Sequence, residues 1–179
     1  MKNDEFLPRH VVELSESAFV EAIPDLAAIL VDAVESGASV GFVLPFTLEE
    51  AAGWWRSLTA DVSAGRIVVL LLRVDGRAVG TAQLRLAPLP NARHRAEVAK
   101  VLVHRDARRH GISRTLMACV EYAARRRGRD LLVLDTIAGS DAERLYLRLG
   151  WTRLGEIPNY AGMPDGSLAP TVVFYKELK

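Results

Sequence analysis

Residues 101–113 read Val-Leu-Val-His-Arg-Asp-Ala-Arg-Arg-His-Gly-Ile-Ser, an apolar run followed by a short basic turn and a glycine where a helical pattern begins. The first amides of a helix lack intrahelical partners, and the helix dipole is positive at that end. Arg108, Arg109 and Gly111 would add charge and close backbone approach to an anion site there. A solvated basic turn is the other interpretation, but the strand and helix on its two sides favour a site for a phosphate-bearing ligand.

Strands and helices alternate on both sides of this stretch. Continuous apolar runs predict buried strands, and apolar residues at helical spacing predict helices. The predicted strands are 11–14, 67–74, 78–86, 96–103, 131–136, 151–157 and 171–178. The predicted helices lie within 18–34, 48–62, 112–124 and 140–149. A strand, a helix and a second strand after residue 96 imply a parallel pair with a right-handed crossover, so we expect one mixed α/β domain with helices on both faces of its sheet.

Capping residues mark where several of these helices begin. Thr47 with Glu50, and Ser140 with Glu143, have the spacing of capping boxes, in which each pair satisfies two free backbone donors. Pro24 predicts a break in the first helix, because proline removes a backbone donor and clashes with the preceding turn.

Composition and charge exclude several classes of protein. The chain has 179 residues, half of them hydrophobic, and a net charge of +1. A near-neutral chain without aromatic residues among its basic runs is not expected to bind nucleic acid, and no apolar run suits a membrane span or a signal core. Cys119 is the only cysteine and the four histidines lack metal-ligand spacing, so we expect no disulfide and no metal. We expect a cytoplasmic monomer or homodimer.

Three side chains could carry acid–base chemistry. Glu97 lies in a predicted central strand, where it is either neutralised by a basic neighbour in a buried pair or, with its pKa raised by burial, a general base. Strict alternation places Lys100 on the opposite face from Glu97. Asp135 ends the next strand, where ligands bind in α/β sheets, although a loop-capping role suits it too. Tyr146 is either a core tyrosine or a proton donor to a leaving thiolate.

The segment 108–113 resembles the cofactor loop of the GNAT N-acetyltransferases, usually written Arg/Gln-x-x-Gly-x-Gly/Ala. Ser113 departs from the small last residue, although its hydroxyl could donate to a phosphate. Other segments are similar to the tabtoxin-resistance acetyltransferases of that family. They are Gly37-Ala38-Ser39-Val40-Gly41-Phe42, Arg95-Ala96-Glu97-Val98, Leu134-Asp135-Thr136, Ala138-Gly139-Ser140, Tyr146, Gly155-Glu156-Ile157-Pro158 and Pro164-Asp165-Gly166. The similarity covers residues 10–178, so we expect one N-acetyltransferase domain over 1–179.

The resemblance implies a GNAT fold, a mixed and mostly antiparallel sheet in which two parallel strands splay apart to admit acetyl-CoA as cosubstrate. By position, the residues that bind acetyl-CoA would be Val101, Leu102, Val103, Arg108, Arg109, His110, Gly111, Ile112, Ser113, Arg114 and Ser140. The backbone of Leu102 and Val103 would hold the acetyl carbonyl and the pantetheine arm, and 108–114 the diphosphate. Glu97 and Asp135 match positions that deprotonate the acceptor amine, with the main base left open, and Tyr146 matches the acid toward the CoA sulfur.

The implied reaction is direct attack of a neutral amine on the thioester. We expect a small-molecule amine as acceptor, for example a tabtoxin-like amino acid or an antibiotic, and hence a role in toxin resistance. The loops 39–42 and 159–166, with Trp55 nearby, are the candidate acceptor pocket. Two alternatives stay open: an N-acetyltransferase for proteins or peptides, which needs an open groove, and a non-catalytic acyl-CoA-binding module, which would not need the three acid–base side chains.

Overall fold

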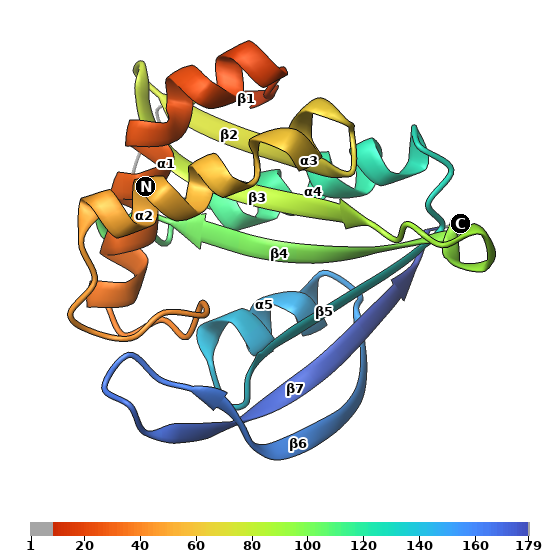
Figure 1. Cartoon of the computed structure of the whole chain (residues 1–179). Coiled ribbons are helices and arrows are strands. Elements are labelled where there is room, and N and C mark those ends of the chain that lie inside the picture. The colour runs from red at the N-terminus through yellow and green to blue at the C-terminus, as the bar shows by residue number, and fades with distance from the viewer. Residues whose placement is uncertain (1–8, 179) are drawn as a thin grey trace, which may run out of the picture.

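One seven-stranded sheet runs through the computed structural model, which describes residues 9–178 (Figure 1). Its strands are β1 Arg9–Glu13, β2 Ile67–Val74, β3 Arg77–Leu86, β4 Arg95–Val103, β5 Leu131–Ile137, β6 Thr152–Gly162 and β7 Leu168–Glu177. The helices are α1 Glu16–Glu35, α2 Leu48–Ser57, α3 Thr59–Ser63, α4 Ile112–Arg125 and α5 Asp141–Arg148. The strand order is β1-β2-β3-β4-β5-β7-β6. Every neighbouring pair is antiparallel except β4 and β5, which are parallel as predicted.

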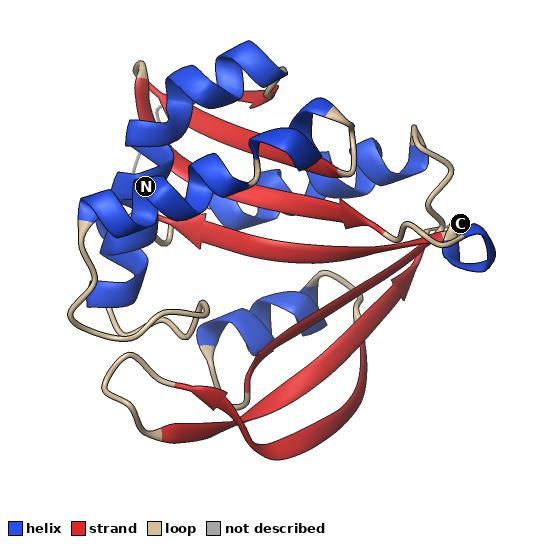
Figure 2. Cartoon of the chain, in the orientation of Figure 1, coloured by secondary structure: helices blue, strands red, loops and turns tan. Residues whose placement is uncertain are grey.

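Helices cover both faces of the sheet, which confirms the predicted layers (Figure 2). The helices α1, α2 and α3 enclose one hydrophobic core, and α4 and α5 enclose the other. The strand β2 contributes to both cores: Val69 and Leu71 face α1, while Leu70 and Leu72 face α4. This is why the run is continuously apolar rather than alternating. Of the helices between residues 9 and 178, none combines the length and hydropathy that crossing a bilayer requires.

The parallel pair is joined along only part of its length. β4 and β5 pair over three positions, the last of which joins Glu97 to Val133. Beyond that pair the two strands diverge (Figure 1). β5 instead keeps its other partner, β7, from Leu131 to Ile137. The sheet is therefore open between the second half of β4 and the end of β5, and this opening positions the site.

A bulge in β4 changes which side chains face each core. Lys100 and Val101 together stand opposite Ala82, and Lys100 has a φ of 50°. An extra residue in one strand reverses the alternation of side chains beyond it. Val98 therefore lies in the core under α4, whereas Leu102 lies in the core under α1. Strict alternation from Val98 to Leu102 was wrong, and Lys100 lies on the α1–α2 side of the sheet.

The capping box of α2 is confirmed, and that of α5 is shifted. Glu50 donates its backbone N–H to Thr47 Oγ1 at 3.2 Å, and the Glu50 carboxylate accepts the Thr47 amide at 2.8 Å. Ser140 caps α5 by accepting the Glu143 amide at 3.1 Å. The Glu143 carboxylate, however, accepts from Gly139 at 2.6 Å rather than from Ser140.

Two predicted boundaries were wrong. α1 continues through Pro24. Val20, whose carbonyl loses its helical partner there, lies on the exposed side of α1, where water can replace that partner. β6 continues through 158–162 instead of ending at Ile157, because its pairing with β7 resumes at Ala161 after an irregularity that accommodates Pro158.

Candidate active site

The loop between β4 and α4 presents backbone amides that no other group binds. β4 ends at Val103, a 3-10 turn covers Arg105–Ala107, and Gly111 is the N-cap of α4. Within residues 9–178, the amides of 109–114 have neither a backbone nor a side-chain acceptor. Arg109 and Gly111 have φ values of 66° and 74°, which fold the backbone into the kind of concavity that binds anions. The loop therefore has the donors that a diphosphate needs.

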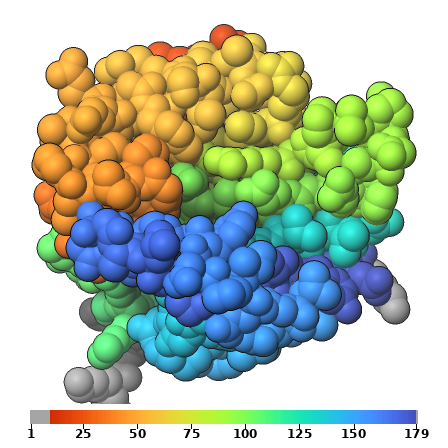
Figure 3. Space-filling view, turned by 60° about the horizontal axis from the view of Figure 1, so that its bottom comes forward, coloured from red at the N-terminus to blue at the C-terminus, as the bar shows by residue number. Residues whose placement is uncertain are grey.

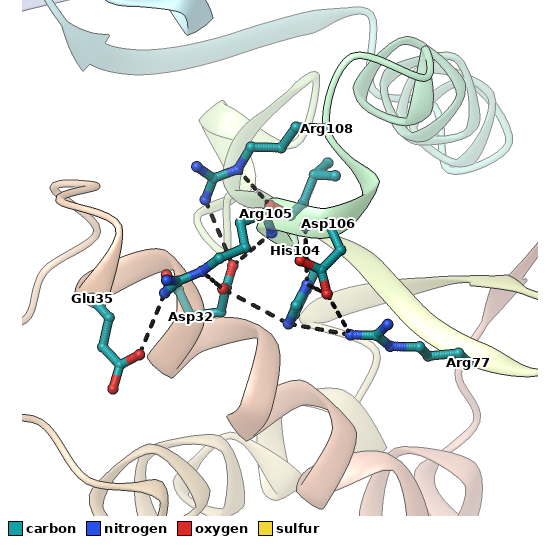
Figure 4. A network of polar contacts seen from close by, with 8 residues as sticks. Asp32, Glu35, Arg77, His104, Arg105, Asp106 and Arg108 are labelled. Atoms are coloured by element: carbon teal, nitrogen blue, oxygen red, sulfur yellow. Dashed lines mark hydrogen bonds and ion pairs between the residues drawn. The ribbon is translucent and has the colours of Figure 1, made fainter.

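A buried aspartate on α1 fixes this loop (Figure 4). Asp32, only 6% exposed, accepts the backbone amide of Arg105 at 2.9 Å and also binds the Arg105 guanidinium. His104 Nε2 and Arg108 Nη2 lie 3.7 and 3.6 Å from its two oxygens. Sequence reasoning missed Asp32, because nothing in the sequence distinguishes it from Asp25 on the same helix.

The side chain of Arg108 has a structural partner. Its Nε donates to the carbonyl of Val103 at 3.1 Å, and its Nη2 faces Asp32. The guanidinium is thus occupied at the base of the loop, and the backbone of the next six residues is what remains free. The side chains of Arg109, His110 and Arg114 are exposed.

The start of α5 lies across the opening from this loop. The pKa of Asp141 is lowered first by the hydrogen bond and charge of Arg144, and further by the charge of Arg109. Arg109 is therefore close enough to act on the first turn of α5. Ser140 uses its hydroxyl oxygen as the N-cap of that helix, which leaves the hydroxyl hydrogen free to donate.

The end of β4 offers a backbone donor to the opening at Val103. His104 donates to the carbonyl of Val79 at 2.9 Å, and Leu102 pairs with Thr81 of β3. In an antiparallel ladder the residue between two such pairs points its backbone groups the other way. Val103 therefore points its backbone groups toward β5, where its carbonyl already accepts from Arg108 and its N–H faces the opening, while Leu102 is engaged with β3.

Two carboxylates flank the opening. The Glu97 side chain is 48% exposed, and its Oε1 lies 3.6 Å from Arg85 Nη1. The expected burial of Glu97 is therefore wrong, since β4 and β5 diverge directly beyond it, but its basic neighbour is present. Asp135 is exposed on β5. Burial lowers the pKa of Lys100, and the charges of Glu97 and Asp135 partly oppose that shift, so the structure brings Glu97, Asp135 and Lys100 together.

Tyr146 is buried beside the opening on the α5 side. It is 6% exposed and packs against Trp151 and Phe174, with ring centroids 5.9 and 6.0 Å away. Burial, together with the negative charge of Asp135, raises the pKa of its phenol well above the usual range. No hydrogen bond to its hydroxyl occurs in the described residues. Tyr146 thus packs like a core residue and also keeps a protonated, unpaired hydroxyl.

Lys100 lies in an aromatic box that the sequence did not reveal. Its Nζ is 5.1 Å from the Trp54 ring centroid and 5.9 Å from that of Phe42, which stacks on Phe46. Burial, and secondarily the charge of Arg85, lowers the pKa of Lys100 to about 8. A single lysine inside an apolar strand is the one signal that could have pointed to it.

The two candidate acceptor loops meet over this box. Ser39 Oγ donates to the carbonyl of Gly162 at 2.8 Å, and Leu44 donates its amide to the carbonyl of Pro164 at 2.8 Å. In the space-filling view the orange loop after α1 touches the blue β6–β7 hairpin, and green atoms lie recessed between them (Figure 3). Trp55, placed near the pocket by the sequence, is instead fully buried against Phe19 in the core.

No group of three His, Cys, Asp or Glu side chains that could hold a metal occurs between residues 9 and 178. The polar groups of this site are donors from backbone amides, a phenol and an ammonium, together with carboxylates as acceptors.

Comparison with other proteins relates this site to one family. The sequence profile of the acetyltransferase (GNAT) family matches residues 32–151, which include Asp32, the amide-rich loop and Tyr146. An uncharacterized N-acetyltransferase from the hisH-hisA intergenic region of Azospirillum brasilense is 32% identical over 114 residues. That alignment covers 62% of this chain and spans 66% of the relative's own length.

Solved structures share the fold over nearly the whole chain. A ribosomal-protein-alanine N-acetyltransferase from Brucella melitensis superposes with a TM-score of 0.76 at 27% identity, over 94% of this chain and 99% of that one. A putative acetyltransferase, yncA, from Salmonella typhimurium superposes with a TM-score of 0.75 at 19% identity, over 96% of this chain and 94% of that one. The Salmonella protein was solved with its cofactor acetyl-CoA.

Proposed function

The chain belongs to the GNAT acetyltransferase family, which uses acetyl-CoA as cosubstrate, and we propose that it transfers the acetyl group to the amine of a small molecule. The observation that carries this proposal is the run of free amides at 109–114 beside the opening after Glu97. A CoA diphosphate has acceptor oxygens and no donors at neutral pH, so it matches this run.

The residues that would hold acetyl-CoA follow from the same geometry. The amides of 109–114 receive the diphosphate, and Arg109 and Arg114 add positive charge at its edges. The backbone of 101–103 receives the pantetheine arm, the Val103 N–H that faces β5 receives the thioester carbonyl, and Ser140 donates from the other side of the opening. Acetyl-CoA supplies an activated acyl group, and a donor held on its carbonyl favours the charge that develops during attack.

The proton transfers fall to the side chains beside the opening. Glu97 or Asp135 takes the proton of the attacking amine, through water, since both carboxylates are exposed beside the opening. Tyr146 gives a proton to the departing sulfur. Its raised pKa keeps the phenol protonated at every pH at which the enzyme would work. The reaction thus needs an amine that arrives on the Glu97 side while the thioester lies toward Tyr146.

The acceptor is a small molecule in this proposal, for example a tabtoxin-like amino acid or an antibiotic. The hydrogen bonds of Ser39 to Gly162 and of Leu44 to Pro164 support it, because they close the acceptor side into a recess. The similarity to a ribosomal-protein-alanine N-acetyltransferase favours a second candidate, acetylation of a protein amine. A protein substrate would need the two loops to part.

The test compares two glycines at the two ends of α4. Gly111 and Gly128 both have positive φ, 74° and 64°, so a valine strains the backbone in either place. Gly111→Val also distorts the amide-rich loop, and we expect it to weaken CoA binding by about tenfold or more, as measured by calorimetry. Gly128→Val should lose stability to a similar extent while CoA affinity stays within about twofold of wild type.

Thiol release from acetyl-CoA with panels of amines and peptides then separates the candidates. Turnover with small amines alone supports the proposal, and turnover with peptides alone selects the protein acetyltransferase. CoA binding without turnover of any acceptor would leave an acyl-CoA-binding module. Wild-type protein that binds no CoA would contradict all three.

A further inference from the structure

Two lysines in the described part of the chain have opposite surroundings. Lys176 on β7 donates to Glu121 Oε1 at 2.6 Å and to the carbonyl of Leu149 at 2.8 Å. Lys100 on β4 has no hydrogen bond and no ion pair to any residue from 9 to 178. An ammonium carries three donors, and a mostly buried one without acceptors is costly. Lys100 is therefore placed for a partner that the protein itself does not provide.

Lys100 keeps its charge at neutral pH although its burial disfavours the charged form. Burial lowers the pKa of Lys100 to about 8, which still leaves most of it protonated at neutral pH. The faces of Phe42 and Trp54 attract a cation, and the aromatic walls hold the Nζ in one place. Gly41 borders the ammonium as well, since a Cβ at this position would be in ordinary van der Waals contact with the Nζ, at 3.9 Å. The β4 bulge, the aromatic box and this glycine together aim one ammonium at the acceptor side.

Two carboxylates and one guanidinium lie near the Lys100 ammonium. Glu97 and Asp135 are near enough to act on Lys100, and so is Arg85. Arg85 already has partners, since its Nε donates to Gln83 Oε1 at 3.1 Å and its Nη1 lies 3.6 Å from Glu97. Lys100 is thus the unpaired cation of the group, while the carboxylates are where the acceptor amine must lose its proton.

We infer that Lys100 binds a carboxylate of the acceptor, which is therefore a zwitterionic amino acid with its amine directed at Glu97 and Asp135. The inference rests on the proposed function and adds the substrate class. A zwitterion complements two cations and two carboxylates, whereas a polyamine or an amino sugar would bring only positive charge toward Lys100 and Arg85. The aromatic walls would exclude water from the ion pair and so strengthen it.

The experiment pairs each acceptor with its uncharged analogue. Amino acids and their carboxamides are assayed by thiol release with saturating acetyl-CoA, together with spermidine and an aminoglycoside. For the wild-type protein we expect the best acceptor to be a free acid, preferred over its carboxamide by about 10- to 100-fold in kcat/KM, as for loss of one charge-assisted hydrogen bond. Lys100→Met should abolish that preference, and Lys100→Arg should restore most of it.

Lys176→Met is the matched control, because it also removes a lysine ammonium from the sheet but at a site away from the opening. It should keep the wild-type preference. Tryptophan fluorescence in the presence of CoA, to which Trp54 contributes beside Trp55 and Trp151, reports acceptor binding independently of turnover, and only the free acids should change it.

Several results would overturn the inference while leaving the acetyltransferase intact. One is a best acceptor that lacks an anionic group; another is a preference for the acid that survives Lys100→Met. Acetylation of Lys100 itself, seen by peptide mass spectrometry, would make it an acceptor rather than a binding residue. Bound CoA with neither turnover nor a fluorescence response for any free acid would also count against it. Failure to bind CoA at all would instead contradict the proposed function.

Discussion

Lys100 is unfavourable for the stability of the fold but is well placed to bind a ligand. Burial without a protein acceptor makes its charged form unfavourable, and the opening beside it is where an acceptor must arrive. Buried residues that weaken the fold but serve a ligand are typical of functional sites. The effect on the free energy of unfolding can be measured, because the charge of Lys100 changes within an accessible pH range.

Lys100→Met should stabilise the protein without ligand. The pKa of Lys100 is about 8 in the folded chain and near 10.5 when unfolded, so the unfolded state binds more protons between those values. The penalty is full below pH 8 and disappears as the pH rises toward 10.5. We expect the variant to be more stable at neutral pH by on the order of 1–3 kcal/mol, less than the full shift because the aromatic faces favour the cation. Urea unfolding at several pH values measures this, and a stability difference that does not shrink above pH 8 would contradict it.

Tyr146→Phe should slow acetyl transfer without weakening CoA binding. It removes the proton donor but keeps the ring packed on Trp151 and Phe174. We expect kcat to fall by about 100-fold, the lower range for general acid catalysis, with CoA affinity within about twofold of wild type. Tyr122→Phe on the exposed side of α4 is the control. Unchanged turnover of the Tyr146 variant would remove this tyrosine from the acid role.

Glu97→Gln and Asp135→Asn distinguish the two candidate bases. Without the base, only amine that is already neutral in solution can react, and that fraction falls as the pH is lowered. The rate of the variant that has lost the main base should therefore fall further below the wild-type rate as the pH is lowered. The rate of the other variant should differ from the wild-type rate by a factor that does not depend on pH. If neither rate falls further below the wild-type rate at low pH, solvent is the base.

Among the elements, the turn between β4 and α4 depends on α1. Asp32 ties Arg105 and Arg108 to that helix, and these residues precede the free amides directly. A ligand-binding loop held by a buried carboxylate is pre-organised, so less free energy is lost in ordering it when the ligand binds. Removal of Asp32 should thus lower both the free energy of unfolding and the affinity for CoA.

Asp32→Asn should lower the unfolding free energy by about 1–3 kcal/mol and weaken CoA binding by about tenfold, because two arginines lose a charged acceptor. Asp25→Asn on the same helix is the comparison, since Asp25 pairs with Arg73 at 2.5 Å but is much more exposed. That change should cost less than about 1 kcal/mol and leave CoA affinity unchanged. Equal effects of the two substitutions would show that Asp32 does not position the loop.

At the scale of the whole molecule, the sequence was enough to predict two cores on one sheet and the parallel pair. Continuous apolar strands and amphipathic helices are local patterns, and the handedness of the crossover is general. The acceptor side could not be predicted in the same way. The bulge at Lys100 reverses an alternation that looks regular in sequence, and only tertiary packing decides that Trp54 rather than Trp55 faces the site. Glu97 and Asp135 were identified as candidates, but their exposure follows from the divergence of β4 and β5, which leaves no mark on the residues themselves.

The proposed activity depends on the binding of a CoA diphosphate by the free amides at the start of α4. Amide proton and nitrogen chemical shifts of residues 109–114, followed by NMR while CoA is added, test it most directly. We expect these six signals to move together and further than those of α1, with their protons shifted downfield by the new hydrogen bonds. Saturation with CoA while these signals stay in place would contradict it.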